Sequence, residues 1–349
     1  MISVCINNYN YERFLGAAID SVLAEQASAG SPMELVVVDD GSTDGSRRII
    51  ESYGGRLRAV LTANGGQAAA FNAGFAVARG DAVLFLDADD VLLPGVVDAV
   101  AAAFATTPRP AKVQVRMAVI DAEGTPTGEL IPGRPRPSRT VDLRDHLRRF
   151  RSYPWPPSSA NAYDAVALRE VLPIPEPEYR GSCDSYLSEL VLYLGSLVDL
   201  DVVGVGYRLH SSNDYFGTPL DATWLRTKMA RLVRNHERAV AVAARLGVPG
   251  PPPDPLAPLD VALLGFRLAS LRLDPVGHPF PGDRPQRLAR DGIRAALTNP
   301  LLTRRDRVIR PAWFALVGLL PRRAAARLVR RFVPDTPLRL RPSWLKRRS

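Results

Sequence analysis

Three carboxylates are crowded into the segment "FLDADD", residues 85–90. Asp87, Asp89 and Asp90 follow an apolar run, residues 82–86, that has the composition of a buried strand. Crowded carboxylates repel one another and resist ionisation unless a cation is present. Their hard oxygen atoms suit Mg²⁺ or Mn²⁺, which takes one or two protein carboxylates together with substrate phosphates. A helix-capping turn is the alternative, but capping uses one carboxylate and leaves two unexplained.

A second acidic stretch, "ELVVVDDGSTDGS" at residues 34–46, reads as a strand, a glycine-containing turn and a helix start. Ser42, Thr43 or Asp44 can cap that helix, and Gly41 suits the turn. Asp39 belongs to the predicted strand, so it is not placed to cap the helix that follows. A hydrogen bond to a nucleoside base or ribose is the alternative for its carboxylate.

The first third of the chain alternates short apolar runs with helical patterns, which indicates an α/β fold with a mostly parallel, Rossmann-like sheet and helices on both faces. In such sheets ligands bind outside the carboxyl ends of the strands. Polar loops follow each predicted strand, at residues 7–10, 39–42, 64–67 and 87–90, so we expect them to converge on one edge. The predicted strands are residues 2–6, 35–38, 57–61 and 82–86, and the predicted helices are residues 11–25, 44–53 and 67–78.

Four motifs occur in order: "ISVCINNYNYERFLGAAIDSVLAEQ", "ELVVVDDGSTDGS", "NGGQAAAFNAGFAVARGDAVLFLDADD" and "GYRLHSSN". Together they resemble the family 2 inverting glycosyltransferases with a GT-A fold. The resemblance is close over residues 1 to about 104 and sparser to about 213. We expect a catalytic domain at 1–215. We expect a mainly helical region at 216–349, with a proline-rich linker near 249–258 and a basic amphipathic tail.

The resemblance implies a nucleoside-diphosphate sugar donor, such as a UDP-, GDP- or dTDP-sugar, with Mg²⁺ or Mn²⁺ as cofactor. It implies a role in the synthesis of cell-surface glycan or glycolipid, on a glycan or lipid-linked acceptor. Asp87 would approach the ribose, Asp89 would contact the metal, and Arg208 and His210 would reach the phosphates, with His210 also a metal ligand. Asn8, Tyr9 and Asp39 would hold the nucleoside, and Asn64, Gly66, Gln67 and Asn72 would border the donor pocket.

An inverting transfer also needs a base that takes the proton of the acceptor hydroxyl. The family places an Asp of a Glu-Asp pair at the head of a helix, and here "GSCDSYLSELVLYLG" occupies that place. Asp184 is therefore the expected base, although Ser182 or Asp184 could instead cap the helix. Cys183 has no histidine beside it in sequence, so a buried cysteine is expected rather than a nucleophile.

Three other functions are considered. A nucleotidyltransferase favours a glycine-rich, basic loop after the first strand, and "NNYNYERF" is no such loop. A nucleic-acid binder is suggested by the pI near 9.9, but few aromatic residues are interleaved with the basic ones, so we expect no nucleic-acid partner. A non-catalytic nucleotide-sugar binder would have lost Asp89 or Asp184, and both are present.

The basic charge is concentrated at the end of the chain. The last 49 residues hold fourteen Lys and Arg against two Asp, whereas the whole chain carries +9. With Trp313, Phe314, Leu316 and Leu319 these cations predict an interfacial segment on an anionic membrane, and a helical subdomain is the alternative. We see no signal peptide, and the two distant cysteines suit a reducing compartment, so we expect a cytoplasmic protein, peripheral at the inner face of the membrane.

Overall fold

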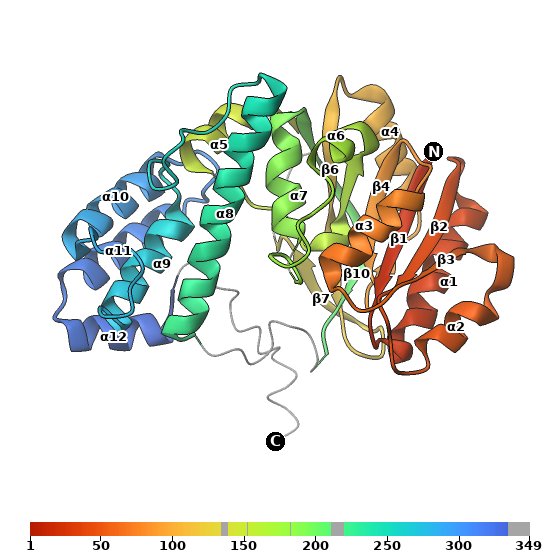
Figure 1. Cartoon of the computed structure of the whole chain (residues 1–349), viewed down its shortest axis with the longest axis horizontal. Coiled ribbons are helices and arrows are strands. Elements are labelled where there is room, and N and C mark those ends of the chain that lie inside the picture. Colours follow the sequence, from red (N-terminus) through yellow and green to blue (C-terminus); the bar gives the residue numbers. More distant parts are fainter. Residues whose placement is uncertain (134–138, 152, 182, 211–219, 334–349) are drawn as a thin grey trace. The chain divides into compact units, whose positions relative to one another are not determined.

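The computed structural model describes residues 1–133, 139–151, 153–181, 183–210 and 220–333. The chain divides into two units, which are described separately. The sheet unit comprises Met1–Arg144 and Trp155–His210, and the helical unit comprises Asp145–Pro154 and the chain from Ser211 onward (Figure 1). The residues "SSN" at 211–213 and Ser182, singled out above, lie outside the described residues.

The sheet unit is built on a central sheet with the strand order β3-β2-β1-β4-β9-β6-β10-β5. The strands β3, β2, β1 and β4 are parallel, as the sequence predicts. The strand β9 is antiparallel and lies between β4 and β6, whereas β6 and β10 pair in parallel. The strands are β1 (Ile2–Asn8), β2 (Met33–Asp39), β3 (Arg58–Leu61), β4 (Ala82–Asp87), β5 (Val91–Leu92), β6 (Pro110–Ile120), β7 (Pro126–Ile131), β8 (Arg139–Val141), β9 (Asn161–Asp164) and β10 (Ser196–Arg208).

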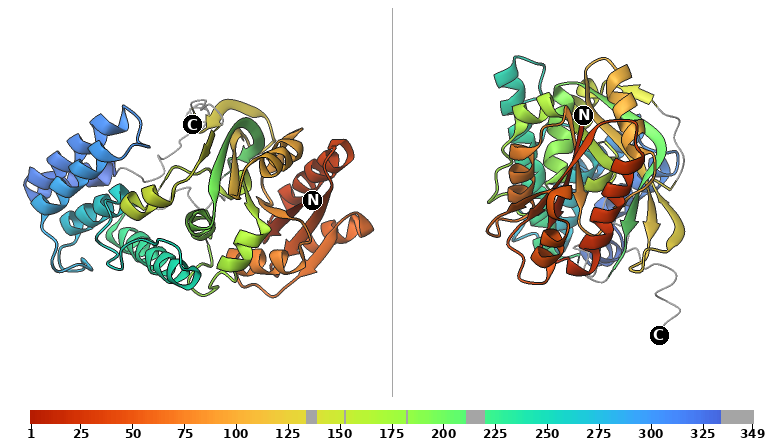
Figure 2. Two further views of the ribbon diagram at one scale, coloured as in Figure 1. Left: turned by 90° about the horizontal axis from the view of Figure 1, so that it is seen from above. Right: turned by 90° about the vertical axis from the view of Figure 1, so that its right-hand side faces the viewer.

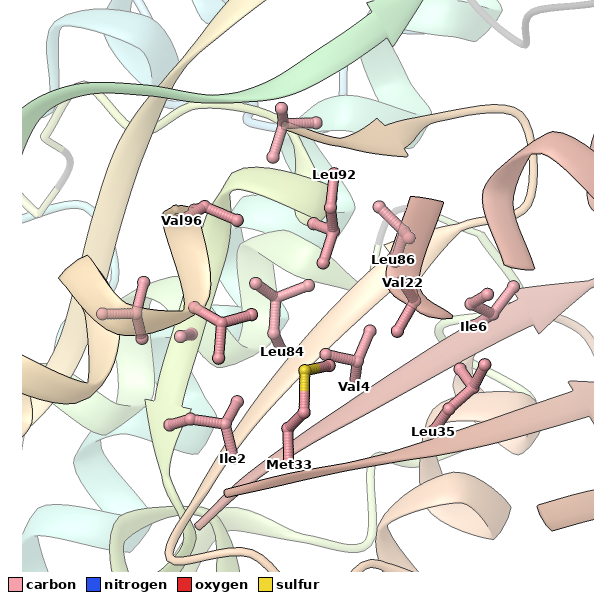
Figure 3. Packing of buried hydrophobic residues seen from close by; sticks show 14 of the residues in the cluster. Ile2, Val4, Ile6, Val22, Met33, Leu35, Leu84, Leu86, Leu92 and Val96 are labelled. Carbon is pink, nitrogen blue, oxygen red and sulfur yellow. The ribbon is translucent and has the colours of Figure 1, made fainter. Parts of the chain in front are cut away.

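Helices cover both faces of this sheet, whose strong twist the two views of Figure 2 show. On one face, Ile2, Val4 and Ile6 pack with Leu84 and Leu86 against helices α1 and α4 (Figure 3). On the other face, Phe85 stacks on Phe71 of α3, with ring centroids 4.1 Å apart. Alternate residues of a strand point to opposite faces, so β4 carries buried apolar side chains on both sides. The helices of this unit are α1 (Glu12–Ser28), α2 (Ser46–Ser52), α3 (Gln67–Val77), α4 (Val96–Thr106), α6 (Ala165–Val171) and α7 (Asp184–Leu190).

The helical unit has its own apolar core, formed by helices α8, α9, α10, α11 and α12. Trp313 and Phe314 are buried in that core, so the prediction that these two side chains contact a membrane is wrong. Within the described residues, no helix combines the length and apolar character needed to span a bilayer. The remaining helices are α5 (Arg144–Phe150), α8 (Ala222–Leu246), α9 (Val261–Leu273), α10 (Pro285–Thr298), α11 (Asp306–Leu319) and α12 (Arg322–Arg331).

Candidate active site

The pairing register brings the carboxyl ends of the parallel strands together. Asn8 at the end of β1 pairs with Asp39 at the end of β2, and Asn7 pairs with Asp87 at the end of β4. Asp39 also pairs with Leu61, the last residue of β3. The polar loops that follow these strands therefore begin at one level of the sheet and share its edge.

The three carboxylates of "DADD" are directed to three different sets of partners. Asp87 accepts hydrogen bonds from the side-chain amides of Asn7 at 2.8 Å and Gln67 at 3.3 Å. The Oδ2 atom of Asp89 lies 2.9 Å from Nε2 of His210. Asp90 accepts from Ser159 Oγ at 2.6 Å and from the backbone N–H of Arg208 at 2.9 Å. Asp90 thus fastens β10 and the segment before β9 to the end of β4, and Asp87 and Asp89 remain as the site carboxylates.

This cluster holds more negative charge than its surroundings compensate. Burial, together with the charges of Asp89 and Asp184, raises the pKa of Asp87 to about 7, although hydrogen bonds from Asn7 and Gln67 oppose the shift. Burial and the charges of Asp89 and Asp87 also raise the pKa of Asp90 well above its usual value. A bound cation would favour the ionised form of both groups.

Asp89 and His210 have the chemistry of a partial divalent-metal site. Their side chains are both buried, and the His210 ring is held by stacking on Phe14 at 4.7 Å and by an edge contact with Tyr11 at 5.8 Å. Among the described residues, no group of three or more His, Cys, Asp or Glu could hold a metal ion alone. One carboxylate and one imidazole nevertheless fit Mn²⁺ or Mg²⁺, because phosphate oxygens and water commonly fill the remaining positions.

Asn8 and Asp39 form a buried pair on the α1 side of the sheet. The Asn8 side-chain amide donates to Asp39 Oδ1 at 2.9 Å and to Ser42 Oγ at 3.1 Å. The backbone N–H of Ser42 donates to Asp39 Oδ2 at 3.3 Å, so Asp39 also shapes its own loop. Tyr9 lies beside them and is exposed.

The loop after β3 is held by Asp40, a residue that the sequence analysis did not single out. Its two carboxylate oxygens accept from the backbone N–H groups of Gly65 at 2.9 Å and Gly66 at 2.7 Å. Asn64 Oδ1 accepts from the guanidinium of Arg180 at 2.6 Å. Gly66 adopts a φ of +91°, and an added Cβ would lie 2.7 Å from the carbonyl oxygen of Arg180. The loop and the segment before α7 therefore pack backbone against backbone, which requires glycine here.

Gln67 connects the strand-end carboxylates to the helix that begins with Asp184. Its amide nitrogen donates to Asp87, and its amide oxygen accepts from the backbone N–H of Cys183 at 3.3 Å. Asp184 is the first residue of α7, whereas Cys183 occupies the N-cap position without a side-chain cap bond. Because the charge of Asp184 contributes to the raised pKa of Asp87, the two carboxylates share one electrostatic environment.

Asn72 and Arg208, both expected at the donor, also make contacts within the protein. The Asn72 side chain donates to the carbonyl of Ile174 at 2.9 Å and accepts from its N–H at 2.8 Å. The Arg208 guanidinium donates to the carbonyls of Asp89 at 2.7 Å, Asp121 at 3.3 Å and Ala122 at 3.2 Å. Asn72 thus ties α3 to the segment that leads to α7, and Arg208 holds the "DADD" turn against the loop after β6.

Other polar residues near the site carried no recognisable pattern in the sequence. Lys112 lies in β6, and Ser159 lies in the short turn at Ser158–Ala160 that precedes β9. Lys112 is fully buried, and its ammonium group donates to Ser188 of α7 at 2.9 Å. Burial lowers the pKa of Lys112 well below its usual value, against the opposing charges of Asp184 and Asp199. Cys183 is buried and burial raises the pKa of its thiol, which does not suit a nucleophile.

Comparisons with known proteins relate this chain to glycosyltransferases. Residues 3–165 match the model of the Glycosyl transferase family 2. The chain is 36% identical over 219 residues to an uncharacterized glycosyltransferase of Nostoc sp., and the match covers 61% of this chain and 66% of that protein. It is 42% identical over 94 residues to the undecaprenyl-phosphate 4-deoxy-4-formamido-L-arabinose transferase of Aeromonas hydrophila, with 26% of this chain and 29% of that protein covered.

Solved structures support the fold. The crystal structure of S. aureus TarS 1-349 in complex with UDP-GlcNAc superposes with a TM-score of 0.50 at 18% sequence identity. The superposition covers 94% of this chain and 89% of that one. At this level of identity the likeness concerns the fold, and the site residues are argued from the contacts described above.

Proposed function

Because this chain belongs to glycosyltransferase family 2, we propose that it moves a sugar from a nucleoside diphosphate to an acceptor hydroxyl group, with inversion at the anomeric carbon. The observation that carries the proposal is the connection made by Gln67. This one side chain bonds both to Asp87, at the donor end of β4, and to the backbone at the start of α7, where Asp184 lies. The carboxylate that we assign to the donor and the candidate base are therefore close enough for the charge of one to influence the other.

The donor would lie across the carboxyl ends of β1, β2 and β4. We assign the nucleoside to the loops that carry Tyr9 and Asp39, and the ribose to Asp87. The loop at Asn64–Gln67, fixed by Asp40, would border the sugar. Asn8 already donates a hydrogen bond to Oδ1 of Asp39. Asp39 would therefore contact the nucleoside base through Oδ2, which can accept a further hydrogen bond.

Asp89 and His210 would hold the divalent cation. When bound, Mg²⁺ or Mn²⁺ supplies positive charge that stabilises the departing diphosphate. Phe14 and Tyr11 keep the His210 ring in place, and Arg208 keeps the backbone of Asp89 in place through the bond to its carbonyl oxygen. These contacts orient the two ligand side chains before any donor arrives, which lowers the cost of ordering them on binding.

Asp184 would act as the general base in a single displacement. Its carboxylate takes the proton of the acceptor hydroxyl while that oxygen forms a bond to the anomeric carbon. The bond from that carbon to the phosphate oxygen breaks, and the nucleoside diphosphate leaves with the electron pair. Asp184 is half-buried and its Oδ1 accepts from the N–H of Ser185 at 2.8 Å, which fixes the side chain at the first turn of α7.

We further propose that the acceptor is a glycan or a lipid-linked molecule of the cell envelope. The support is the name of the Aeromonas hydrophila relative, which specifies undecaprenyl phosphate. The competing function is a protein that binds a nucleotide-sugar without turning it over. It would bind donor as tightly as an enzyme does, so binding alone cannot separate the two.

The test is a panel of nucleotide-sugars, scored both for thermal stabilisation with Mn²⁺ and for hydrolysis of the donor. A bound donor raises the melting temperature by mass action. An enzyme should also release free nucleoside diphosphate, and that release should disappear in Asp184→Asn. Stabilisation without release by the wild-type protein, under any acceptor tried, would support the non-catalytic alternative.

A further inference from the structure

Helix α11 of the helical unit has two apolar faces, and only one of them is buried. Trp313, Phe314, Val317 and Gly318 face the core of the unit. The indole N–H of Trp313 donates to the carbonyl of Phe332 at 2.8 Å, which ties α11 to the end of α12. This face of α11 is therefore buried inside the helical unit.

The opposite face of α11 presents aliphatic side chains to solvent. Val308 is 71% exposed, Leu316 50% and Leu319 75%. With the exposed Ala312 they follow one another at intervals of four, four and three residues, the spacing of a single stripe along a helix. We call these four residues the α11 stripe. Large aliphatic side chains gathered on one exposed face indicate an interaction surface, whereas single exposed ones do not.

Cations lie at both ends of the α11 stripe. Arg305 occupies the N-cap position with helical backbone angles, three residues before Val308, and therefore extends the stripe. Arg304 precedes it, and Arg322 and Arg323 follow Leu319 within four residues; all four arginines are exposed. The acidic residue of this helix, Asp306, accepts a hydrogen bond from Thr303 and pairs with Arg310 at 3.5 Å. Its charge is therefore already matched within its own helix.

We propose that the α11 stripe and the arginines at its ends dock on the surface of an anionic phospholipid bilayer. The aliphatic side chains enter the boundary between headgroups and acyl chains, and the guanidinium groups bind lipid phosphates. The stripe is one narrow row on a single helix, whereas a stable protein interface buries roughly 800 Å² per partner. A fluid lipid surface needs no such complementary area. The excess of fourteen Lys and Arg over two Asp in the last 49 residues attracts the same surface.

This docking is independent of the proposed sugar transfer, because it uses no residue of the strand-end site. Truncation of the chain is not a suitable test of this docking. Removal of the chain after Asn299 would delete Trp313 and Phe314 from the core, so loss of binding by a truncated protein would report unfolding. Point substitutions on the exposed stripe avoid that ambiguity.

The experiment is sedimentation of the full-length protein with vesicles of phosphatidylcholine alone or mixed with phosphatidylglycerol. The decisive variant is Leu316→Ser with Leu319→Ser, which leaves the net charge unchanged. Its matched control is Val276→Ser, which removes a 99% exposed aliphatic side chain from the loop between α9 and α10. A second variant, Arg304→Gln with Arg305→Gln, removes two cations from the N-terminal end of the stripe.

We expect the wild type and Val276→Ser to pellet with the anionic vesicles only. The double leucine variant should lose about tenfold or more of its partitioning. The double arginine variant should lose about 25-fold, because each cation contributes roughly fivefold. Far-UV circular dichroism and melting temperature should match the wild type in every variant. Binding by the double leucine variant equal to that of the wild type would overturn the proposal. A shift from dimer to monomer in that variant, seen by gel filtration without vesicles, would also overturn it and assign the stripe to a second copy of the chain.

Discussion

Asp89 and His210 lie 121 positions apart in the chain, yet Oδ2 of one is 2.9 Å from Nε2 of the other. The contact joins the turn after β4 to a residue two positions beyond the end of β10. Each side chain is buried, and each belongs to a type that binds Mn²⁺ or Mg²⁺. A cation that enters between them would exchange this contact for two ligand bonds.

Loss of either ligand should weaken metal-dependent nucleotide binding. We expect Asp89→Asn to reduce the affinity for UDP in the presence of Mn²⁺ by about tenfold or more, with a smaller loss for His210→Gln. Isothermal titration with and without chelator measures this, using UDP as one representative nucleotide. Glu51→Gln, an exposed charge removal on α2, is the control for a general charge effect. Equal Mn²⁺-dependent affinity in Asp89→Asn and wild type would disprove the metal assignment.

Replacement of the proposed base should affect turnover and spare donor binding. Asp184→Asn is expected to lower kcat by roughly 10²–10⁴, because a general base contributes about that much, while donor affinity stays near the wild-type value. The control is Glu51→Gln, the exposed charge removal on α2, far in the sequence from the proposed base. If Asp184→Asn keeps more than about a third of wild-type turnover, the base is another residue, and Glu178 and the buried Glu189 are the next to examine.

Gly66 is predicted to be intolerant of any side chain. Gly66→Ala would force a φ of +91° on alanine and place its Cβ 2.7 Å from the carbonyl oxygen of Arg180. We expect a loss of about 1–3 kcal/mol in the free energy of unfolding, measured by urea titration. The control is Gly55→Ala, which makes the same chemical change at a position where no atom lies within 4 Å of the added Cβ. If both variants lose similarly little free energy of unfolding, the backbone at Gly66 moves away from that of Arg180 at little cost.

His236 should make the stability of the helical unit fall in mild acid. Burial, with the charge of Arg151 adding to it, lowers the pKa of His236 below its ordinary value. The unfolded chain therefore binds the proton first, so stability is complete above about pH 6.5 and is lost as the pH falls through the lowered folded value. We expect His236→Gln to flatten the fall in melting temperature between about pH 7 and 5. The two proteins are compared by the slope of melting temperature against pH. The absolute melting temperatures also differ because the variant changes the contact of Nε2 with the Pro252 carbonyl at 2.7 Å. Parallel slopes would exclude His236 as the group responsible.

The repeating pattern of the first ninety residues determined the fold of that part without tertiary information. Alternation between apolar strands and helical spacing is local, and each predicted element there appears within a few residues of its expected bounds. The convergence of Asn8, Asp39 and Asp87 follows as well, because neighbouring parallel strands in register end at one edge. The alternatives for "DADD" stayed open, since spacing in sequence does not say which carboxylate bonds to a distant residue.

Only the tertiary structure decided what depends on partners far along the chain. Asp90 accepts hydrogen bonds from Ser159 and from the backbone of Arg208. Asn72 accepts one from the backbone of Ile174, which lies more than a hundred positions further along the chain. The antiparallel strand β9 lies between β4 and β6, an arrangement that no local pattern of apolar residues predicts. The apolar run in α11 likewise looked uniform in sequence. Packing in the helical unit buried Trp313 and Phe314 and left Leu316 and Leu319 in solvent, because the faces of a helix acquire different environments only when a neighbour covers one of them.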